Sequence, residues 1–246
     1  MSFLIAISCF ALAQGLAEES PTNRVLRLDG KTGYMTVADS ASLHSLSNAM
    51  TLEVRFRATS FYESGGAVNS LLRKNVKAGA ENFFLRFRII NRKPMVEVTP
   101  GIEIGVVRAP FDFKPGTWYH LAASFDGTNV QVFVDGVAIK SDGRAGSMRI
   151  DDSELVIGRG DPEYSSGEYF DGAVDEIRIW AVARSPGEIQ AGMKTRMTGK
   201  ERGLIAYWNF DDGTTADQSG HGNSGVLKEA AQIVDSTRLT SVSPER

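Results

Sequence analysis

The sequence has 246 residues, of which 42% are hydrophobic and 23% are charged, a composition typical of a globular protein. Lys and Arg number 27 against 30 Asp and Glu, and the formal net charge of −3 argues against a dedicated nucleic-acid-binding protein, which usually carries a basic excess. Three histidines and one cysteine argue against zinc-finger, iron–sulfur and disulfide-based folds, whereas 25 glycines favour many tight turns between short strands.

The N-terminal segment is expected to be a targeting sequence rather than part of the fold. Residues 3–13 form the only long apolar run, and small residues follow with candidate cleavage sites after Ala13 and Ala17. The run is far shorter than the roughly 20 residues of a membrane helix and is typical of a secretory signal peptide, although no Lys or Arg precedes it. We therefore predict a signal peptide over residues 1–17 and a secreted, periplasmic or cell-surface location. The alternatives are a buried first strand and, because of Cys9, a lipoprotein anchor.

The body of the chain alternates apolar and polar residues with a period of two, which is the pattern of half-buried β-strands. In residues 51–58, Leu52, Val54 and Phe56 fall on one face, and charged residues fall on the other. The Asp135-Gly136 dipeptide between two apolar runs indicates a hairpin, since glycine adopts a positive φ at low cost. Strands are predicted over residues 51–58, 83–90, 95–98, 102–107, 118–125, 130–134, 137–140, 155–157, 174–180 and 204–210.

Only residues 185–194 are predicted to be helical. Ser185 fits the N-cap, Pro186 fits the first turn, and Glu188 follows Ser185 by three residues as in a capping box. Because strands and helices do not alternate, a parallel α/β sheet is not expected. The sequence instead predicts an all-β protein, a two-sheet antiparallel sandwich with one short surface helix. One domain is expected over residues 18–234, followed by a flexible tail over 235–246.

Several motifs follow one another along the chain. Residues 28–37 read L-D-G-K-T-G-Y-M-T-V, residues 118–127 read W-Y-H-L-A-A-S-F-D-G, residues 132–136 read V-F-V-D-G, and residues 170–180 read F-D-G-A-V-D-E-I-R-I-W. Residues 204–211 read L-I-A-Y-W-N-F-D, and residues 217–223 read D-Q-S-G-H-G-N. Together, over nearly all of residues 25–228, this series resembles the laminin-G-like, concanavalin A-like jelly roll of many secreted bacterial proteins. The resemblance implies a jelly-roll sandwich with Trp118, Trp180 and Trp208 in its core, but a fold does not by itself determine function.

The resemblance also implies one structural calcium ion that joins the opening strand to the closing strands. Its candidate ligands are Asp29, the carbonyl of Gly30, Asp175, Asp211 and Asn223. Such hard oxygen ligands suit Ca²⁺ rather than Zn²⁺, and a bridging cation would stabilise a sandwich without cysteine cross-links. The alternative is that these residues accept local backbone hydrogen bonds in turns.

No residue pattern for catalysis is recognised in the sequence. Glycoside hydrolysis needs two carboxylates on either side of the scissile bond, and the E-x-D-x-E strand of related β-glucanases is missing from the sequence. Adjacent Asp175 and Glu176 are expected to face opposite ways on their strand, so that they cannot act on one bond. Residues 53–57 only superficially resemble the Arg-rich strand of alginate lyases. The protein is therefore predicted not to be an enzyme, and a divergent polysaccharide hydrolase or lyase is the alternative.

Loops with tyrosine and charged residues are the candidate binding sites, because aromatic rings stack on sugar faces and charged groups bind hydroxyls. The alternative is that the loop tyrosines pack on their own strands. A row of arginines would form the solvated face of one sheet if its strands are neighbours, where it could attract an anionic glycan. The candidate ligand-binding residues are Tyr62, Arg159, Asp161, Tyr164 and Tyr169, and the arginines of the row are Arg55, Arg57, Arg86, Arg88 and Arg92.

These observations predict a secreted, non-catalytic binding module whose partner is a polysaccharide or another extracellular glycan. An extracellular protein is the alternative partner, as expected of a cell-surface adhesion module. His120, on the apolar strand 118–125, is expected to be packed and hydrogen-bonded rather than to bind a metal.

Overall fold

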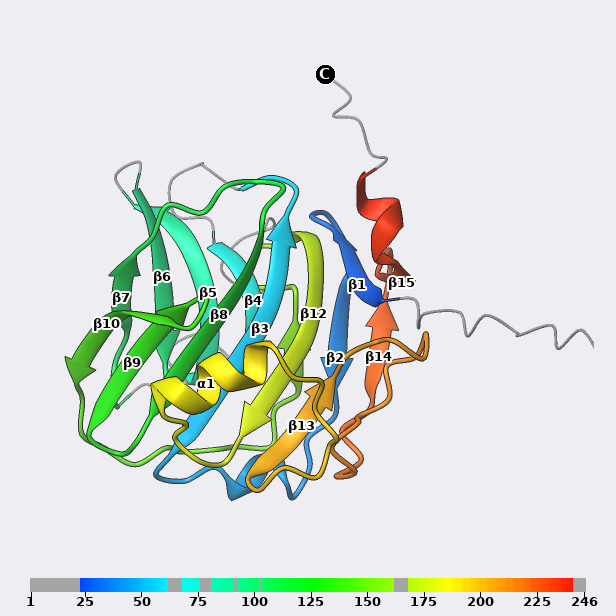
Figure 1. Ribbon diagram of the computed structural model, residues 1–246. Helices are drawn as coiled ribbons and strands as arrows, with labels where there is room; N and C mark the ends of the chain where they lie inside the picture. The colour runs from blue at the N-terminus through cyan, green and yellow to red at the C-terminus, as the bar shows by residue number, and fades with distance from the viewer. Residues whose placement is uncertain are drawn as a thin grey trace, which may run out of the picture.

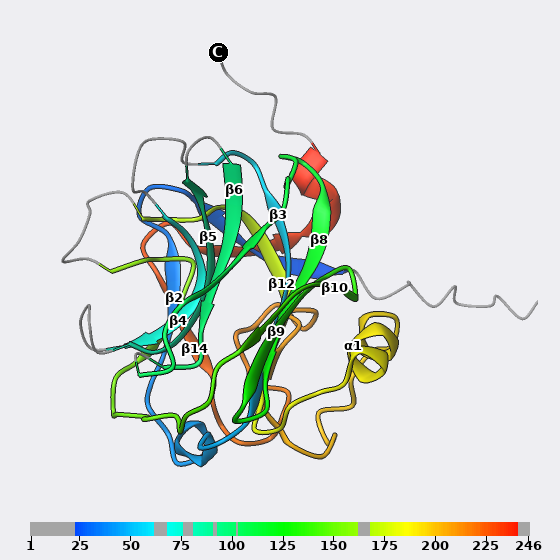
Figure 2. The same ribbon diagram turned by 90° about the vertical axis from the view of Figure 1, so that its left-hand side faces the viewer.

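Two antiparallel β-sheets pack face to face and form the body of the molecule (Figure 1, Figure 2). The computed structural model describes residues 23–61, 68–75, 81–90, 93–101, 103–161 and 168–240. The predicted two-sheet antiparallel sandwich with one short helix is therefore confirmed. The predicted signal peptide over residues 1–17 lies outside the described residues.

The first sheet, sheet A, carries the helix on its outer face. Its strands run in the order β10-β9-β8-β3-β12-β1-β15, and β13 also pairs with β12. β1 pairs with the first half of β12, through Leu26 opposite Val174, and β13 pairs with the second half, through Ile177 opposite Trp208. Sheet A contains β1 (Arg24–Asp29), β3 (Met50–Ala58), β8 (Trp118–Phe125), β9 (Asn129–Val134), β10 (Val137–Gly143), β12 (Asp171–Trp180), β13 (Leu204–Trp208) and β15 (Gln232–Asp235).

The second sheet, sheet B, runs in the order β14-β2-β11-β4-β5-β6-β7. The predicted strand over residues 102–107 is wrong, because the carbonyl of Gly101 accepts hydrogen bonds from the N–H groups of Ile104 and Gly105 in a turn. β4, β14 and β15 were not predicted, since their sequences show no sustained alternation. Sheet B contains β2 (Tyr34–Val37), β4 (Val68–Asn75), β5 (Glu81–Ile90), β6 (Lys93–Thr99), β7 (Val107–Pro110), β11 (Leu155–Ile157) and β14 (Gly225–Lys228).

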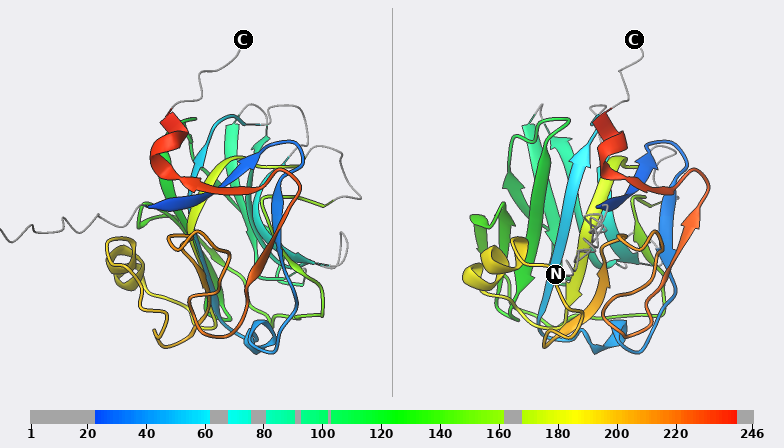
Figure 3. Two further views of the ribbon diagram at one scale, coloured as in Figure 1. Left: turned by 90° about the vertical axis from the view of Figure 1, so that its right-hand side faces the viewer. Right: turned by 45° about the vertical axis from the view of Figure 1, so that its right-hand side comes forward.

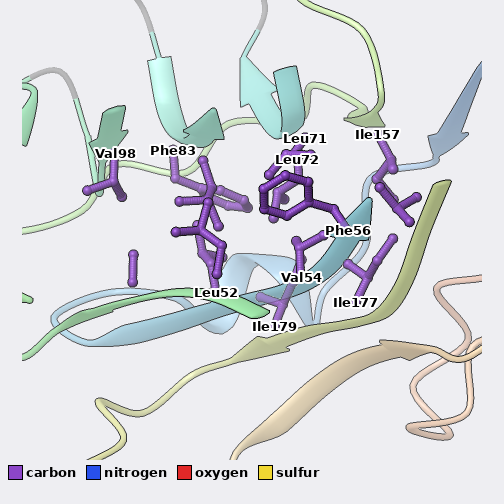
Figure 4. Packing of buried hydrophobic residues seen from close by; sticks show 14 of the residues in the cluster. Leu52, Val54, Phe56, Leu71, Leu72, Phe83, Val98, Ile157, Ile177 and Ile179 are labelled. Atoms are coloured by element: carbon purple, nitrogen blue, oxygen red, sulfur yellow. The ribbon is translucent and has the colours of Figure 1, made fainter. Parts of the chain in front are cut away.

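The core lies between the sheets and is filled by the apolar residues of the predicted alternation. Leu52, Val54 and Phe56 of β3 point from sheet A toward sheet B, where they meet Phe83 and Leu72 (Figure 4). Each side chain in this layer is removed from water, which is the main favourable term in folding. The opposite residues of the same strands therefore lie on the outer faces of the sandwich.

The helix α1 (Pro186–Met193) lies across the outer face of sheet A (Figure 1, Figure 3). The Ser185 Oγ accepts a hydrogen bond from the Glu188 N–H, and the Glu188 carboxylate accepts one from the Ser185 N–H, which confirms the predicted capping box. Ile189 is fully buried against Ala122 and Phe133 of sheet A. No helix in the described part of the chain has the length and apolarity needed to cross a membrane.

Two further expectations differ from the structure. Arg55 and Arg57 lie on β3 of sheet A, whereas Arg86 and Arg88 lie on β5 of sheet B, so the predicted arginine row is divided between opposite faces of the molecule. Arg92 lies outside the described residues. The predicted tail begins inside ordered structure, because residue 235 ends β15 and a short 3-10 helix follows over Ser236–Thr240.

Candidate functional site

The outer face of sheet B carries charged residues on four neighbouring strands. Ser70 of β4 lies opposite Arg86 of β5, which lies opposite Glu97 of β6, which in turn lies opposite Arg108 of β7. Their neighbours along the same strands pack in the core, so that these four residues point away from it. Ser70 and Glu97 are nevertheless buried, which shows that this part of the outer face is recessed.

Three arginines surround the carboxylate of Glu97. The Arg86 Nε donates to Glu97 Oε2 at 2.9 Å, the Arg108 Nε donates to Glu97 Oε1 at 2.8 Å, and the Arg88 Nε lies 3.3 Å from Oε2. The Glu97 side chain is 0% exposed, whereas Arg86, Arg88 and Arg108 are 22%, 25% and 49% exposed. We call these four residues the Glu97 cluster. One negative charge faces three positive charges there, which leaves an excess of cationic surface.

A second charged group adjoins it on the same face. Arg73 of β4 lies 3.9 Å from Asp161, and both side chains are nearly buried. The Glu168 carboxylate accepts a hydrogen bond from the Asp161 N–H at 2.9 Å, and the guanidinium of Arg159 lies close by. Burial lowers the pKa of Arg73, an effect that Asp161 opposes. We call these four residues the Arg73 cluster.

Two tyrosine rings border the Arg73 cluster. The Arg159 guanidinium lies 4.8 Å from the centroid of the Tyr34 ring and 5.5 Å from that of Tyr169. The two ring centroids are 6.2 Å apart, and Arg159 and Tyr169 are joined by a β-bridge. Half-buried aromatic rings therefore lie directly beside charged hydrogen-bonding groups.

The structure brings together three of the five predicted ligand-binding residues, Arg159, Asp161 and Tyr169. Tyr62 and Tyr164 lie outside the described residues. The prediction missed Arg73, because β4 was not predicted. It also missed Glu97, for which the one available sign was a Glu in the otherwise apolar predicted strand 95–98, a position that needs cationic partners.

The outer face of sheet A holds the acidic pair of β12. The expectation that Asp175 and Glu176 face opposite ways is wrong, because the pairing with β3 shifts register between Asp175 and Arg178 and Glu176 has φ +48°. Val174 and Ile177, on either side of the pair, both pack in the core. The β-bulge thus places both carboxyl groups on the outer face.

The environment of this pair does not suit glycoside hydrolysis. Burial and the adjacent Glu176 raise the pKa of Asp175 to about 7, and Arg55 lies 3.2 Å away. The Asp175 side chain is only 1% exposed, so a sugar cannot reach it. Glu176 accepts hydrogen bonds from the Tyr207 hydroxyl and from Arg178. Protein side chains therefore take up the hydrogen-bonding capacity of both carboxyl groups.

Glu53 lies beneath α1 on the same face and is fully buried. Its carboxylate lies 3.0 Å from the His120 Nε2, 3.3 Å from Arg184 and 3.5 Å from Arg178. Burial alone would raise the pKa of Glu53, whereas the hydrogen bond with His120 and the guanidiniums of Arg178 and Arg184 lower it below its usual value. His120 is therefore packed and hydrogen-bonded, as predicted.

The tryptophans were expected to lie in the core, and two of the three are buried. Trp208 packs in the central core, and Trp180 packs with Leu204 and Tyr207 in a second hydrophobic cluster. Trp118 is half-buried, and the Arg55 guanidinium lies 4.5 Å from its ring. A cavity of about 250 Å³ beside α1 is lined in part by Trp118 and Arg55.

The predicted calcium ligands are engaged with protein groups. Asp29 Oδ1 accepts hydrogen bonds from the N–H groups of residues 31–33, which lower its pKa to about 2 against the effect of burial. Gly30 has φ +69°, and a Cβ there would lie 2.6 Å from Asp171. Asp211 lies 2.8 Å from Arg196. Asp29 thus forms the local turn that was the alternative to a calcium site.

The two remaining candidates, Asp175 and Asn223, also bind protein groups. Asp175 pairs with Arg55, and the Asn223 side chain bonds to Ser40, Ser42 and the carbonyl of Ile205. Among the described residues, no group of three or more His, Cys, Asp or Glu is placed to hold a metal ion. The five residues do not form one ligand set here, and calcium binding stays a prediction.

The comparisons with known proteins agree with the fold. The chain is 24% identical over 198 residues to pappalysin-1 of Mus musculus, a match that covers 75% of this chain but only 12% of that protein. A proposed carbohydrate-binding protein from Bacteroides ovatus has a similar structure, with a TM-score of 0.69, 20% identity, and coverage of 88% of this chain and 60% of that chain. A heptameric SAP-like pentraxin from Limulus polyphemus matches with a TM-score of 0.64 and 12% identity, over 91% of this chain and all of that chain.

A family model matches residues 29–190, which is more than half of the chain, and its description is the concanavalin A-like lectin/glucanases superfamily. The matched region runs from the end of β1 into α1 and includes most strands of both sheets. The chain belongs to the concanavalin A-like lectin/glucanases superfamily.

Proposed function

We propose that the protein is a non-catalytic module that binds carbohydrate on the outer face of sheet B. The observation that carries this proposal is the Arg73 cluster with Tyr34 and Tyr169 beside it. Ligand sites typically combine aromatic surface with a few fixed polar groups. Here the aromatic rings offer a surface for the apolar face of a sugar ring, and the charged groups offer donors and acceptors for its hydroxyls.

The rigidity of this surface supports the proposal. Arg73 lies on a central strand of sheet B, and Arg159 and Tyr169 are joined by backbone bridging beside β11. Side chains placed by strands keep their positions better than side chains on free loops, so that less conformational entropy is lost when a ligand binds.

The relatives support the same class of ligand. The protein from Bacteroides ovatus is described as a proposed carbohydrate-binding protein, and the family is named for lectins and glucanases. The lack of catalysis is inferred from sheet A, where the adjacent carboxyl groups of Asp175 and Glu176 are held by protein groups. The alternatives are outcomes of the experiment below, since cleavage of the ligand would indicate a polysaccharide-cleaving enzyme and binding to no glycan would favour a protein-binding module.

The test is a glycan array, followed by titration calorimetry with the best ligand. We expect binding to at least one glycan, and we expect Arg159→Ala and Tyr169→Ala each to weaken it by about tenfold, as for the loss of a buried contact. Arg57→Ala is the matched control, because Arg57 lies on the outer face of sheet A. Binding that is unchanged in both variants would place the site elsewhere. Release of new sugar ends from the ligand would show catalysis instead.

We also infer that the protein acts outside the cytoplasm. The apolar run over residues 3–13, with small residues after it, supports this inference, because it is typical of a signal peptide. Expression with the native N-terminus, followed by cell fractionation and N-terminal sequencing, tests it. A protein that keeps residue 1 and stays in the cytoplasm would contradict the inference.

A further inference from the structure

We infer that the carbohydrate ligand is anionic and that its carboxylate or sulfate groups bind the Glu97 cluster. This inference rests on the proposed function, and it names the class of glycan. The cluster lies on the same face of sheet B as the Arg73 cluster, on strands β5, β6 and β7.

The charge of the Glu97 cluster is the first argument. Three guanidiniums face one carboxylate, and in the ion pairs between described residues Arg86, Arg88 and Arg108 share Glu97 as their partner. Two positive charges therefore remain in excess at one place in a chain whose formal net charge is −3. A bound anion would relieve the repulsion among the three guanidiniums.

The orientation of the arginines is the second argument. Arg86 and Arg108 use their Nε atoms to hold Glu97, and no hydrogen bond within the described part of the chain uses their Nη atoms. The Arg86 guanidinium also lies 4.0 Å from the centroid of the Phe84 ring, which limits its rotation. Guanidinium groups bind carboxylate and sulfate-like oxygens through two parallel hydrogen bonds, and those held in advance lose little entropy.

The continuity of the two clusters is the third argument. Arg86 is close enough to Arg73 to help lower the pKa of Arg73, so the clusters adjoin electrostatically. From Tyr34 on β2 to Arg108 on β7 the sheet order counts five strand spacings, or about 24 Å at about 4.8 Å each. A surface of this length fits an oligosaccharide rather than a single sugar.

The experiment is an array that pairs each acidic glycan with a neutral counterpart, such as oligogalacturonate with its methyl ester and sulfated with unsulfated chondroitin. We expect binding to be concentrated on the acidic member of the pairs and to fall by at least tenfold between 50 and 500 mM NaCl. Binding confined to neutral glycans would overturn the inference but keep the proposed function. Binding to no glycan would overturn both.

Variants then locate the charge recognition. We expect Arg108→Gln to weaken binding of the acidic ligand by at least tenfold and Arg108→Lys to weaken it less, because lysine keeps the charge but loses the paired donors. Arg57→Gln on sheet A serves as the matched control and should leave the affinity unchanged. Equal affinity of Arg108→Gln and the wild type would overturn the inference. If Arg108→Gln fails to fold, the salt dependence of wild-type binding decides.

Discussion

Glu53 and Glu97 are both fully buried on the outer faces of the sandwich and both lie among cationic side chains, but only Glu53 is sealed from above. The Arg178 that faces Glu53 donates to the carbonyl of Gly192, and Arg184 donates to the carbonyl of Glu188. Both carbonyls belong to α1, so this cluster fastens the helix to sheet A.

The cluster around Glu97 has no such cover from α1, which lies on the opposite side of the sandwich (Figure 2). Its arginines are 22% to 49% exposed, compared with 3% and 12% for Arg178 and Arg184. The same chemical unit, a buried glutamate with cationic partners, therefore stabilises a tertiary contact on one face and leaves charged surface open on the other. Whether such a cluster anchors a helix or stays exposed therefore depends on what the Nη atoms of its arginines bind. In the Glu53 cluster they bind carbonyls of α1.

The largest effect is expected from Glu53→Gln, which removes the buried negative charge that faces the guanidiniums of Arg178 and Arg184. Removing one member of a buried ion pair typically costs about 3–5 kcal/mol. We expect a loss of this order in the free energy of unfolding, measured by urea denaturation at pH 7. A loss below about 1 kcal/mol would mean that the Glu53 cluster does not fasten α1 and would remove the contrast with Glu97.

Asp175 provides an intermediate case, a buried carboxyl with a single guanidinium partner. Its folded pKa of about 7 lies above the ordinary value of 3.8, so between pH 4 and pH 7 the folded state holds a proton that the unfolded state releases. Ionisation of Asp175 therefore lowers the free energy of unfolding as the pH rises through that window. We expect the free energy of unfolding of Asp175→Asn, relative to that of the wild type, to increase from pH 4 to pH 8 when both are measured by urea denaturation. A difference that does not change with pH would contradict this assignment.

Glu97→Gln should cost less than Glu53→Gln, because its three arginines can still be hydrated. We expect a loss of about 1 kcal/mol in the free energy of unfolding, in the range of partly exposed ion pairs. Urea denaturation of the two variants side by side measures the comparison directly. An equal loss in both variants would show that the Glu97 cluster is as closed as the Glu53 cluster.

Ser185→Ala tests the helix that seals Glu53. The variant removes the N-cap that binds the Glu188 N–H, and loss of such a cap typically costs about 1 kcal/mol. We expect this decrease in the free energy of unfolding, measured by urea denaturation, with Ser185→Thr as the matched variant that keeps a capping hydroxyl. If Ser185→Thr is as unstable as Ser185→Ala, the cap is not the cause.

The smallest effect is expected from removal of divalent cations. Asp29 and Asn223 already bind protein groups in the structure, so a chelator should change the melting temperature little. Thermal melts with EDTA and with added CaCl₂ measure this effect. A clear rise of the melting temperature with calcium would instead support the calcium prediction and identify a site that the described residues do not form by themselves.

Much of the fold could be predicted from the sequence, because it depends on local patterns. The alternation in residues 51–58 and 118–125 located β3 and β8, and the spacing of Ser185, Pro186 and Glu188 located α1. Arg159, Asp161 and Tyr169 could be named as candidates for the binding site because tyrosine and charged residues cluster in their loop. These signals lie within a few residues of one another, so no knowledge of the partner strands is needed to read them.

Local sequence patterns were enough to predict the core-facing residues of β3, the start of α1 and a β-sandwich. Which charged side chains meet depends on the pairing of strands. Glu97 finds its arginines on two neighbouring strands, and the bulge after Asp175 turns Glu176 to the same face. Strand order and register depend on contacts between residues far apart in the chain, and a shift of one residue moves a side chain to the other face. Strand pairing, rather than the local sequence, therefore determines which arginines anchor α1 and which remain exposed on sheet B.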